Sequence, residues 1–157
     1  MASRGEQAQP PAGPDPGANE AGLNEALEYF NDTLERVLAG EELPLHPFLS
    51  PDCELVNFEP SPFPGTYRGE EGFRRWTHDL FDDFTDARIE AVEIVPDGDL
   101  MAVRMRLSGK GRSSGIEGSF EWGCLISVEN GLCTRAASDP TFERTLERLE
   151  EERAQRD

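Results

Sequence analysis

The spacing of the apolar residues changes near residue 85, and this change limits what the chain can fold into. Before it, apolar side chains recur at helical spacing, as at Leu27, Phe30 and Leu34. After it, they alternate with polar ones, most clearly over residues 100–107. A helical period of 3.6 followed by several runs of period 2 is typical of an α+β protein. We therefore expect N-terminal helices packed on one face of a curved, mainly antiparallel sheet.

The pattern also predicts the individual elements. In the first half we expect a helix over 23–39, a helical turn over 44–49, a strand over 52–58, a proline-rich loop ending in Gly-Thr-Tyr-Arg-Gly, and a helix from about residue 69. In the second half we expect strands over 87–95, 100–107, 116–128 and 132–137, with hairpin turns at Pro-Asp-Gly-Asp and Asn-Gly. A last helix is expected over 141–153, with Asp139 as its N-cap and Pro140 at its first position.

The length of 157 residues suits a single domain. Residues 1–20 are rich in Pro, Gly and Ala, so we expect a disordered tail there and one domain over 21–157. The tail lacks a basic start followed by an apolar run, and no apolar stretch approaches membrane-spanning length. We therefore expect a cytoplasmic protein without membrane contact.

The charge and the cysteines exclude further classes. A formal net charge of −17 disfavours a nucleic-acid partner, because phosphates would be repelled. Cys53, Cys124 and Cys133 are odd in number and show no Cys-x-x-Cys spacing, so we expect buried free thiols and not a disulfide or zinc framework. No phosphate-binding glycine loop and no metal-ligand spacing is present in the sequence, so we expect neither a cofactor nor a metal.

Three segments in a fixed order carry a resemblance to a known family: PGTYRGEEGFRRW over residues 64–76, the Asp-Gly-Asp hairpin, and the Asn-Gly hairpin before a last strand ending in Asp139. Over residues 21–149 the chain resembles the SnoaL-like branch of the nuclear transport factor 2 superfamily. The resemblance implies a cone-shaped αβ barrel, usually dimeric, with a hydrophobic pocket between sheet and helices. Relatives include isomerases, polyketide cyclases, epoxide hydrolases and non-catalytic binding or assembly domains.

This chain does not contain the complete catalytic sets of the best-known relatives. A ketosteroid-isomerase-like site needs a tyrosine, a carboxylate base and a protonated acid. At those positions this chain has Thr33, Asn57, and Gly123 or Cys124. An epoxide-hydrolase-like site would match only at Asn57 and Arg104, since Leu55, Arg106 and Ala136 stand where a tyrosine and two carboxylates are needed.

Three functions remain open. The first is a pocket for a small apolar or aromatic molecule, lined by Phe30, Val56, Asn57, Phe58, Tyr67, Phe73, Trp76, Met101 and Trp122. The second is an enzyme of the same family with an unusual catalytic set, drawn from Asn57, Glu59, Tyr67 and Asp139. The third is a structural or assembly dimer with a filled core. In each case we expect a homodimer that pairs through the outer sheet face at Arg104, Arg106 and Glu121. For Tyr67, packing on the third helix is the simpler alternative to a place in the pocket.

Overall fold

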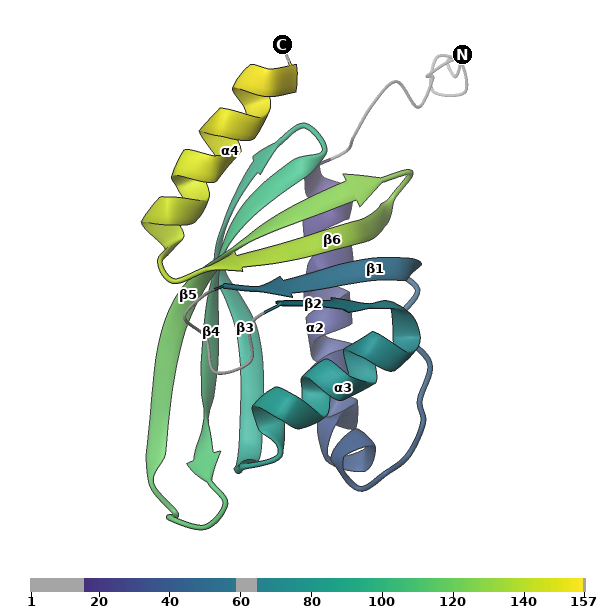
Figure 1. Ribbon diagram of the computed structural model, residues 1–157, viewed down its shortest axis with the longest axis vertical. Coiled ribbons are helices and arrows are strands. Elements are labelled where there is room, and N and C mark those ends of the chain that lie inside the picture. Colours follow the sequence, from purple (N-terminus) through teal and green to yellow (C-terminus); the bar gives the residue numbers. More distant parts are fainter. Residues whose placement is uncertain (1–15, 59–64, 157) are drawn as a thin grey trace, which may run out of the picture.

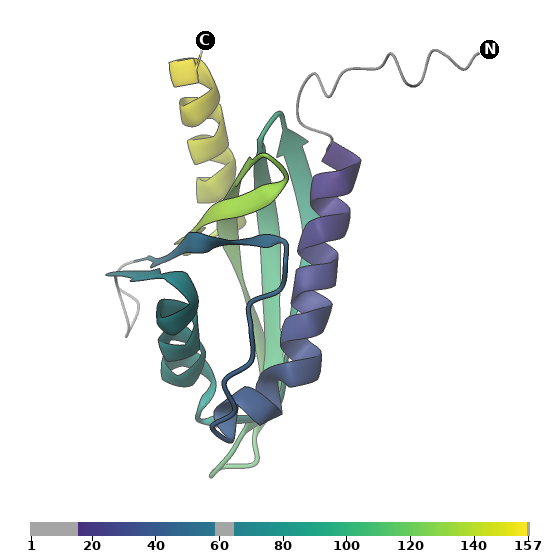
Figure 2. The same cartoon turned by 90° about the vertical axis from the view of Figure 1, so that its right-hand side faces the viewer.

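The computed structural model describes residues 16–58 and 65–156. A curved six-stranded sheet forms the centre of the molecule, in the order β2-β1-β6-β5-β4-β3. Helices α2 and α3 cover its concave face, and α4 lies on the opposite face (Figures 1 and 2). The sheet is not closed, since β2 and β3 are its two edges. The α+β class and the helix-on-sheet arrangement expected from the sequence are confirmed.

Helix α2 spans Pro16–Leu38 and begins earlier than expected. Residues 16–20, which we assigned to a disordered tail, form its first turn, and the rest of that predicted tail lies outside the described residues. Proline suits the first position of a helix because the amide hydrogen it lacks would be unpaired there anyway. The buried face of α2 carries Leu23, Ala26, Phe30 and Leu34 at helical spacing.

The connection from α2 to the sheet contains no second helix. The helical turn expected over 44–49 is wrong: a single hydrogen bond from the Leu49 amide to the His46 carbonyl (2.9 Å) closes a tight turn. Strand β1, Leu49–Asn57, follows directly. The Gly-Thr-Tyr-Arg segment, expected in a loop, is the short strand β2, Gly65–Arg68, which pairs antiparallel with β1. Helix α3, Gly69–Phe81, starts where the sequence predicted.

The remaining strands form an antiparallel meander. They are β3 (Phe84–Asp97), β4 (Leu100–Gly111), β5 (Glu117–Glu129) and β6 (Leu132–Asp139). Strand β6 then pairs in parallel with β1, which joins the early and late parts of the chain in one sheet. This pairing makes the sheet mixed, and it places residues from β1 beside residues from β6 on the concave face.

Two apolar clusters hold the layers together. The larger one lies between α2, α3 and the concave face, where Met101 and Val103 are fully buried. The smaller one lies on the outer face and joins Leu100, Ala102 and Leu125 to Phe142 and Leu149 of α4. Alternation along β4 and β5 supplies one set of side chains to each cluster.

Helix α4 spans Phe142–Arg156 and is anchored differently from the expectation. Its cap is Thr141, whose hydroxyl accepts a hydrogen bond from the Arg144 amide (3.1 Å), so Asp139 is not the N-cap. The Asp139 carboxylate instead accepts hydrogen bonds from Thr145 Oγ1 (2.8 Å) and Arg148 Nε (3.1 Å), both on α4. Asp139 therefore holds α4 against the sheet through hydrogen bonds from the α4 side chains of Thr145 and Arg148.

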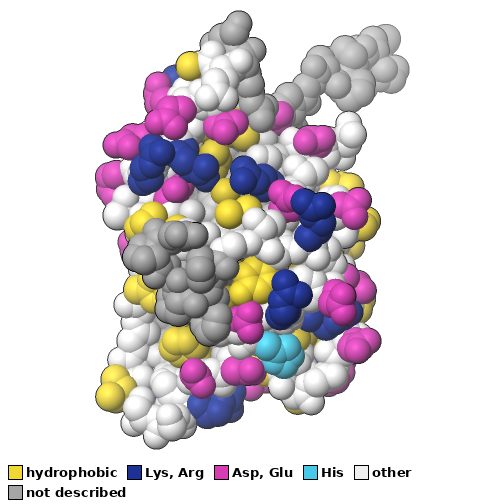
Figure 3. All heavy atoms as spheres, in the orientation of Figure 1, with side chains coloured by type: hydrophobic (Ala, Val, Ile, Leu, Met, Phe, Trp, Pro, Cys, Tyr) yellow, Lys and Arg dark blue, Asp and Glu magenta, His cyan; other side chains and the backbone are white. Residues whose placement is uncertain are grey.

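Within the described segments, no helix is both long and apolar enough to cross a bilayer. On the face shown in Figure 3, basic side chains form a band across the upper half, with acidic side chains beside them.

Candidate functional site

An apolar cavity lies between α2, α3 and the concave face of the sheet, and we call it the sheet cavity. Its volume is about 100 Å³. It is lined by Leu23, Ala26, Leu27, Phe30, Leu49, Leu55, Asn57, Phe73, Trp76, Ile89, Met105, Trp122, Cys124, Ile126, Cys133, Ala136 and Ser138. Pockets for drug-sized ligands measure roughly 300–1,000 Å³, whereas an apolar cavity of about 150 Å³ holds benzene. The sheet cavity is smaller than the benzene-binding cavity, so it accommodates a single ring only when wall side chains such as Phe30 or Phe73 move aside.

Aromatic side chains from both helices form one wall of this cavity. Phe30 projects from α2, while Phe73 and Trp76 project from α3. The ring centroids of Phe30 and Phe73 lie 6.0 Å apart at an interplanar angle of 77°, and those of Phe73 and Trp76 lie 5.6 Å apart. Such edge-on and tilted pairs are favourable arrangements for aromatic rings. The three rings thus pack against one another and present apolar surface to a ligand.

Polar groups in the cavity wall are few. Trp76 Nε1 donates a hydrogen bond to Asn57 Oδ1 (3.1 Å), which fixes the Asn57 amide at the cavity wall. Burial raises the pKa of the Cys124 thiol to about 12, so this thiol stays neutral at physiological pH. Ser138 adds a hydroxyl on β6. The wall offers neutral polar groups for orienting a ligand and little means of stabilising charge.

The described lining residues include no carboxylate and no histidine. General acid–base chemistry needs a group that gains or loses a proton near neutral pH, and Asn57 cannot do so. Glu59, the carboxylate nearest in sequence, lies outside the described residues. Among the described residues, no cluster of three or more metal-binding side chains is found.

The structure brings five of the nine predicted pocket residues together: Phe30, Asn57, Phe73, Trp76 and Trp122 all line the sheet cavity. The other four predicted residues do not line it. Val56 lies between Leu55 and Asn57 on β1 and faces the other side of the sheet. Met101 is completely buried in the core beyond the cavity, and Phe58 packs at the border of the same core.

Tyr67 is held by α3 and does not open into the cavity. Its hydroxyl donates a hydrogen bond to Asp79 Oδ2 (2.8 Å), and the Arg75 guanidinium lies 5.0 Å from the ring centroid. Burial, together with the hydrogen bond to Asp79, raises the pKa of Tyr67 to about 12. This position matches the packing alternative and gives Tyr67 no contact with a reacting group in the cavity.

Asp139 likewise lies apart from the sheet cavity. Its neighbour Ser138 lines the cavity, and alternation along β6 turns Asp139 toward α4 on the outer face. A role for Asp139 as an acid or base in this cavity is therefore not supported by its position.

Sequence reasoning missed lining residues that a closer use of alternation would have found. Cys124 and Ile126 follow Trp122 at a spacing of two along β5, and Met105 shares its face with Met101 on β4. On β1, Leu55 and Asn57 are also two residues apart and share one face. Ala136 and Cys133 had no such signal, because their place depends on the parallel pairing of β6 with β1.

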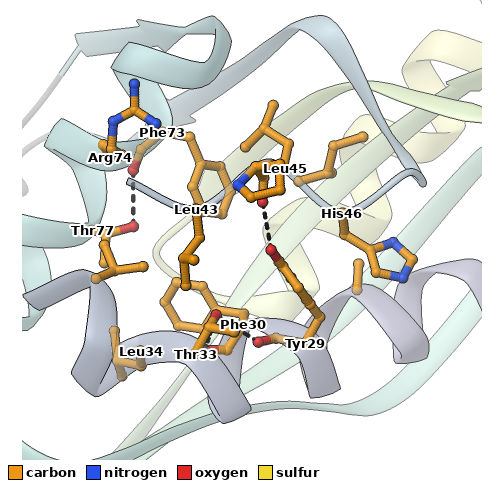
Figure 4. A pocket seen from close by; sticks show the side chains of 14 residues that line it. Tyr29, Phe30, Thr33, Leu34, Leu43, Leu45, His46, Phe73, Arg74 and Thr77 are labelled. Carbon is orange, nitrogen blue, oxygen red and sulfur yellow. Dashed lines mark hydrogen bonds between the residues drawn. The ribbon is translucent and has the colours of Figure 1, made fainter. Parts of the chain in front are cut away.

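A second, smaller cavity lies beside the first and is shown in Figure 4; we call it the loop cavity. It has a volume of about 40 Å³ and lies between α2, residues 43–46 and α3. Tyr29 closes one side, because its hydroxyl donates a hydrogen bond to the Pro44 carbonyl (2.7 Å). Four residues line both cavities and separate them: Ala26, Leu49 and the rings of Phe30 and Phe73. A change of rotamer at either ring would enlarge the space open to a ligand.

An open, curved sheet that encloses an apolar cavity with two helices defines the cone-shaped α+β class of nuclear transport factor 2-like proteins. The chain belongs to the SnoaL-like domain family, whose model matches residues 43–136. A search of curated proteins gives no match.

Solved structures share the fold at low sequence identity. An NTF2-like protein from Burkholderia pseudomallei is 17% identical over 83% of this chain and 95% of its own, with a TM-score of 0.61. TerC, crystallised with polyporic acid, is 19% identical over 83% and 96%, also with a TM-score of 0.61. A protein from Jannaschia sp. CCS1 described as a SnoaL-like polyketide cyclase is 12% identical over 88% and 93%, with a TM-score of 0.60. At these identities the likeness establishes the fold alone.

Proposed function

We propose that this protein binds a small apolar or aromatic molecule in the sheet cavity. The observation that carries the proposal is the cavity itself: about 100 Å³ of space with a wall of aliphatic and aromatic side chains. Filling such a space removes apolar ligand surface from water at little cost, because the wall has few polar groups to desolvate.

The polar end of the cavity supports a ligand with one neutral polar group. Asn57 is oriented by Trp76, and Ser138 lies on the neighbouring part of the wall. A hydroxyl or carbonyl on the ligand can hydrogen-bond to the Ser138 hydroxyl there, whereas a charged group would lose its hydration without compensation. The complex of the structural neighbour TerC with polyporic acid agrees with a ligand-binding use of this fold.

Native mass spectrometry of freshly purified protein tests the proposal, together with an NMR titration with toluene as the probe. We expect toluene to shift the amide signals of residues in α2, α3 and β5 that line the sheet cavity. Ala136→Leu adds side-chain volume at the wall and should weaken toluene binding by about tenfold or more, which corresponds to about 1.4 kcal/mol. Ala21→Leu makes the same chemical change on the exposed side of α2 and should leave binding unchanged.

Two results would contradict a binding function. One is the absence of both a co-purified molecule and any toluene-dependent shift. The other is equal binding by Ala136→Leu and the unaltered protein, which would place the ligand elsewhere. A co-purified molecule that is converted to a product on incubation with the protein would replace the binding function by an enzymatic one.

A further inference from the structure

Two buried cysteines lie side by side at the sheet cavity, and Cys133 forms part of its wall. The Sγ atoms of Cys53 and Cys133 are 3.8 Å apart, within hydrogen-bond distance for sulfur. The two residues are 4% and 2% exposed, and both are free thiols. Sulfur atoms so close, on neighbouring strands and 80 positions apart in sequence, form a preassembled pair.

Irregularities in strands β1 and β6 bring the two cysteines into contact. Between the pairs Leu49↔Cys133 and Glu54↔Arg135, five residue steps of β1 match two steps of β6. The β5–β6 register also shifts, so that Thr134 is an additional residue opposite Ser127 and Val128. Such bulges change the face to which a side chain points. They turn Cys133 toward the cavity, although regular alternation from Ala136 would place Thr134 there.

A small molecule in the cavity meets the pair at Cys133, whose sulfur lies 3.8 Å from that of Cys53. Cys133 lines the sheet cavity, whose volume of about 100 Å³ exceeds the space that one or two waters need. The contact with the Cys133 thiol lowers the pKa of Cys53. The same contact and burial raise the pKa of Cys133, so Cys53 is the more acidic thiol of the two. The pair therefore holds one activated sulfur and one thiol ready to follow it.

We propose that Cys53 and Cys133 form a redox-active pair that a small hydroperoxide converts into an intramolecular disulfide. In the first step, the Cys53 thiolate attacks one peroxide oxygen: the S–O bond forms, the O–O bond breaks, and the leaving oxygen takes up a proton as alcohol or water. In the second step, the Cys133 sulfur attacks Cys53: the S–S bond forms, the S–O bond breaks, and hydroxide leaves with the Cys133 proton as water. The two thiols are oxidised and the hydroperoxide is reduced.

The strands need to move little for this reaction. A disulfide bond is about 2.05 Å long, so the sulfur atoms must approach by about 1.8 Å, which side-chain rotation and small strand shifts can supply. The product would tie β1 to β6 at the cavity wall. The reaction is independent of the proposed ligand, although an occupant of the cavity would shield Cys133 and slow it.

Thiol mapping of the folded protein tests the proposal. Protein treated with hydrogen peroxide, then denatured and alkylated, should lose the mass of two hydrogen atoms and keep one alkylatable thiol. Non-reducing peptide mapping should identify a Cys53–Cys133 crosslink and free Cys124. Dithiothreitol should restore all three thiols. Cys124 is the internal control, because it lines the same cavity and is equally buried.

Variants add a second readout. Cys124→Ala should still form the crosslink, whereas Cys53→Ala and Cys133→Ala should not. Peptide mapping of the unaltered protein tests for the Cys53–Cys133 crosslink even if a variant fails to fold. Three free thiols after prolonged peroxide treatment, a crosslink that includes Cys124, or crosslinks only between two molecules would each overturn the proposal. Toluene binding is measured separately, so a failure of the disulfide and a failure of ligand binding are distinguishable.

Discussion

The Tyr67 side chain joins strand β2 to helix α3 beside the cavity. It lies on β2, and its hydroxyl holds Asp79 at the far end of α3. Gly72 lies against it so closely that an added Cβ would stand 3.0 Å from the Tyr67 carbonyl carbon. The short strand and the helix after it therefore behave as one unit, which presents Phe73 and Trp76 to the sheet.

The Tyr67 hydroxyl predicts a stability change at high pH. Its pKa in the folded state is raised to about 12, against about 10 for an unperturbed tyrosine. A raised pKa contributes stability that is fully present below about pH 10 and is lost as the pH rises through about 12. Tyr67→Phe should lower the free energy of unfolding by about 1.5–3 kcal/mol at neutral pH, because it removes a hydrogen bond to a carboxylate.

Urea unfolding of both proteins at neutral pH and near pH 11 checks this prediction. The unaltered protein should lose more stability over that interval than Tyr67→Phe. Tyr29→Phe is the control, because the Tyr29 hydroxyl bonds a backbone carbonyl at an exposed site. Parallel losses in the unaltered protein and in Tyr67→Phe would show that Tyr67 does not titrate as described.

Residues that line the cavity were predictable where a local pattern marks them. Phe30, Phe73 and Trp76 lie on apolar helix faces, and Trp122 lies on an alternating strand, so the sequence alone indicates their inward direction. Cys133 and Ala136 depend on which strand β6 meets and on a bulge at Thr134. No local period contains that information.

At the scale of elements, Gly123 decides how close α4 can approach the sheet. A Cβ added to Gly123 would stand 2.6 Å from the Thr141 carbonyl oxygen and 2.8 Å from the Phe142 Cα. These neighbours are backbone atoms, so no side-chain rotation can move them away. The absent side chain therefore lets the first turn of α4 lie directly on β5, beside the hydrogen bonds from Thr145 and Arg148 to Asp139.

Gly123→Ala should therefore displace α4 and destabilise the protein by about 1–3 kcal/mol, the usual range for overpacking. Chemical denaturation measures the loss, and amide hydrogen exchange should show faster opening along α4. Gly118→Ala is a matched control on the same strand, because nothing lies within 4 Å of a Cβ added there. Equal stability of the two variants would mean that α4 does not depend on this contact.

The sequence predicted the types of most elements but not all of their ends. The change from period 3.6 to period 2 located α3 and the four strands of the meander within a few residues. It missed β2, because four residues are too few to show a period. It misplaced the α4 cap, because Asp139 and Thr141 are both good capping residues and only the tertiary contacts of Asp139 decide between them.

At the scale of the whole molecule, the outer sheet face remains the predicted surface for a homodimer. Helix α4 covers one part of it, and the Arg104 guanidinium lies 4.6 Å from the Phe142 ring centroid. Arg104 also pairs with Glu93 (3.1 Å), and Arg106 pairs with Glu121 (2.9 Å). This exposed strip is polar, so we expect modest affinity between copies.

Light scattering at tens of micromolar protein tests the dimer. Two copies that each carry a net charge of −17 repel one another, so added salt should strengthen the association by screening. Arg106→Glu places like charges beside Glu121 and should shift the protein toward monomer. Arg36→Glu changes the net charge equally at the end of α2 and should have a smaller effect. A monomer at all salt concentrations would contradict the prediction.

The parallel pairing of β1 with β6 has a consequence for how the protein is made. A ribosome releases the chain from its N-terminus at about 5–20 residues per second, and β1, β2 and α3 emerge well before their partner strand. Cys53 and Cys133 are 80 positions apart, so β1, although it can pair with β2, lacks its second neighbour β6 for several seconds. Contacts between segments so distant in sequence also form slowly. The last strand of the sheet to be synthesised therefore completes the cavity, and until then the apolar faces of α2 and α3 are available to chaperones.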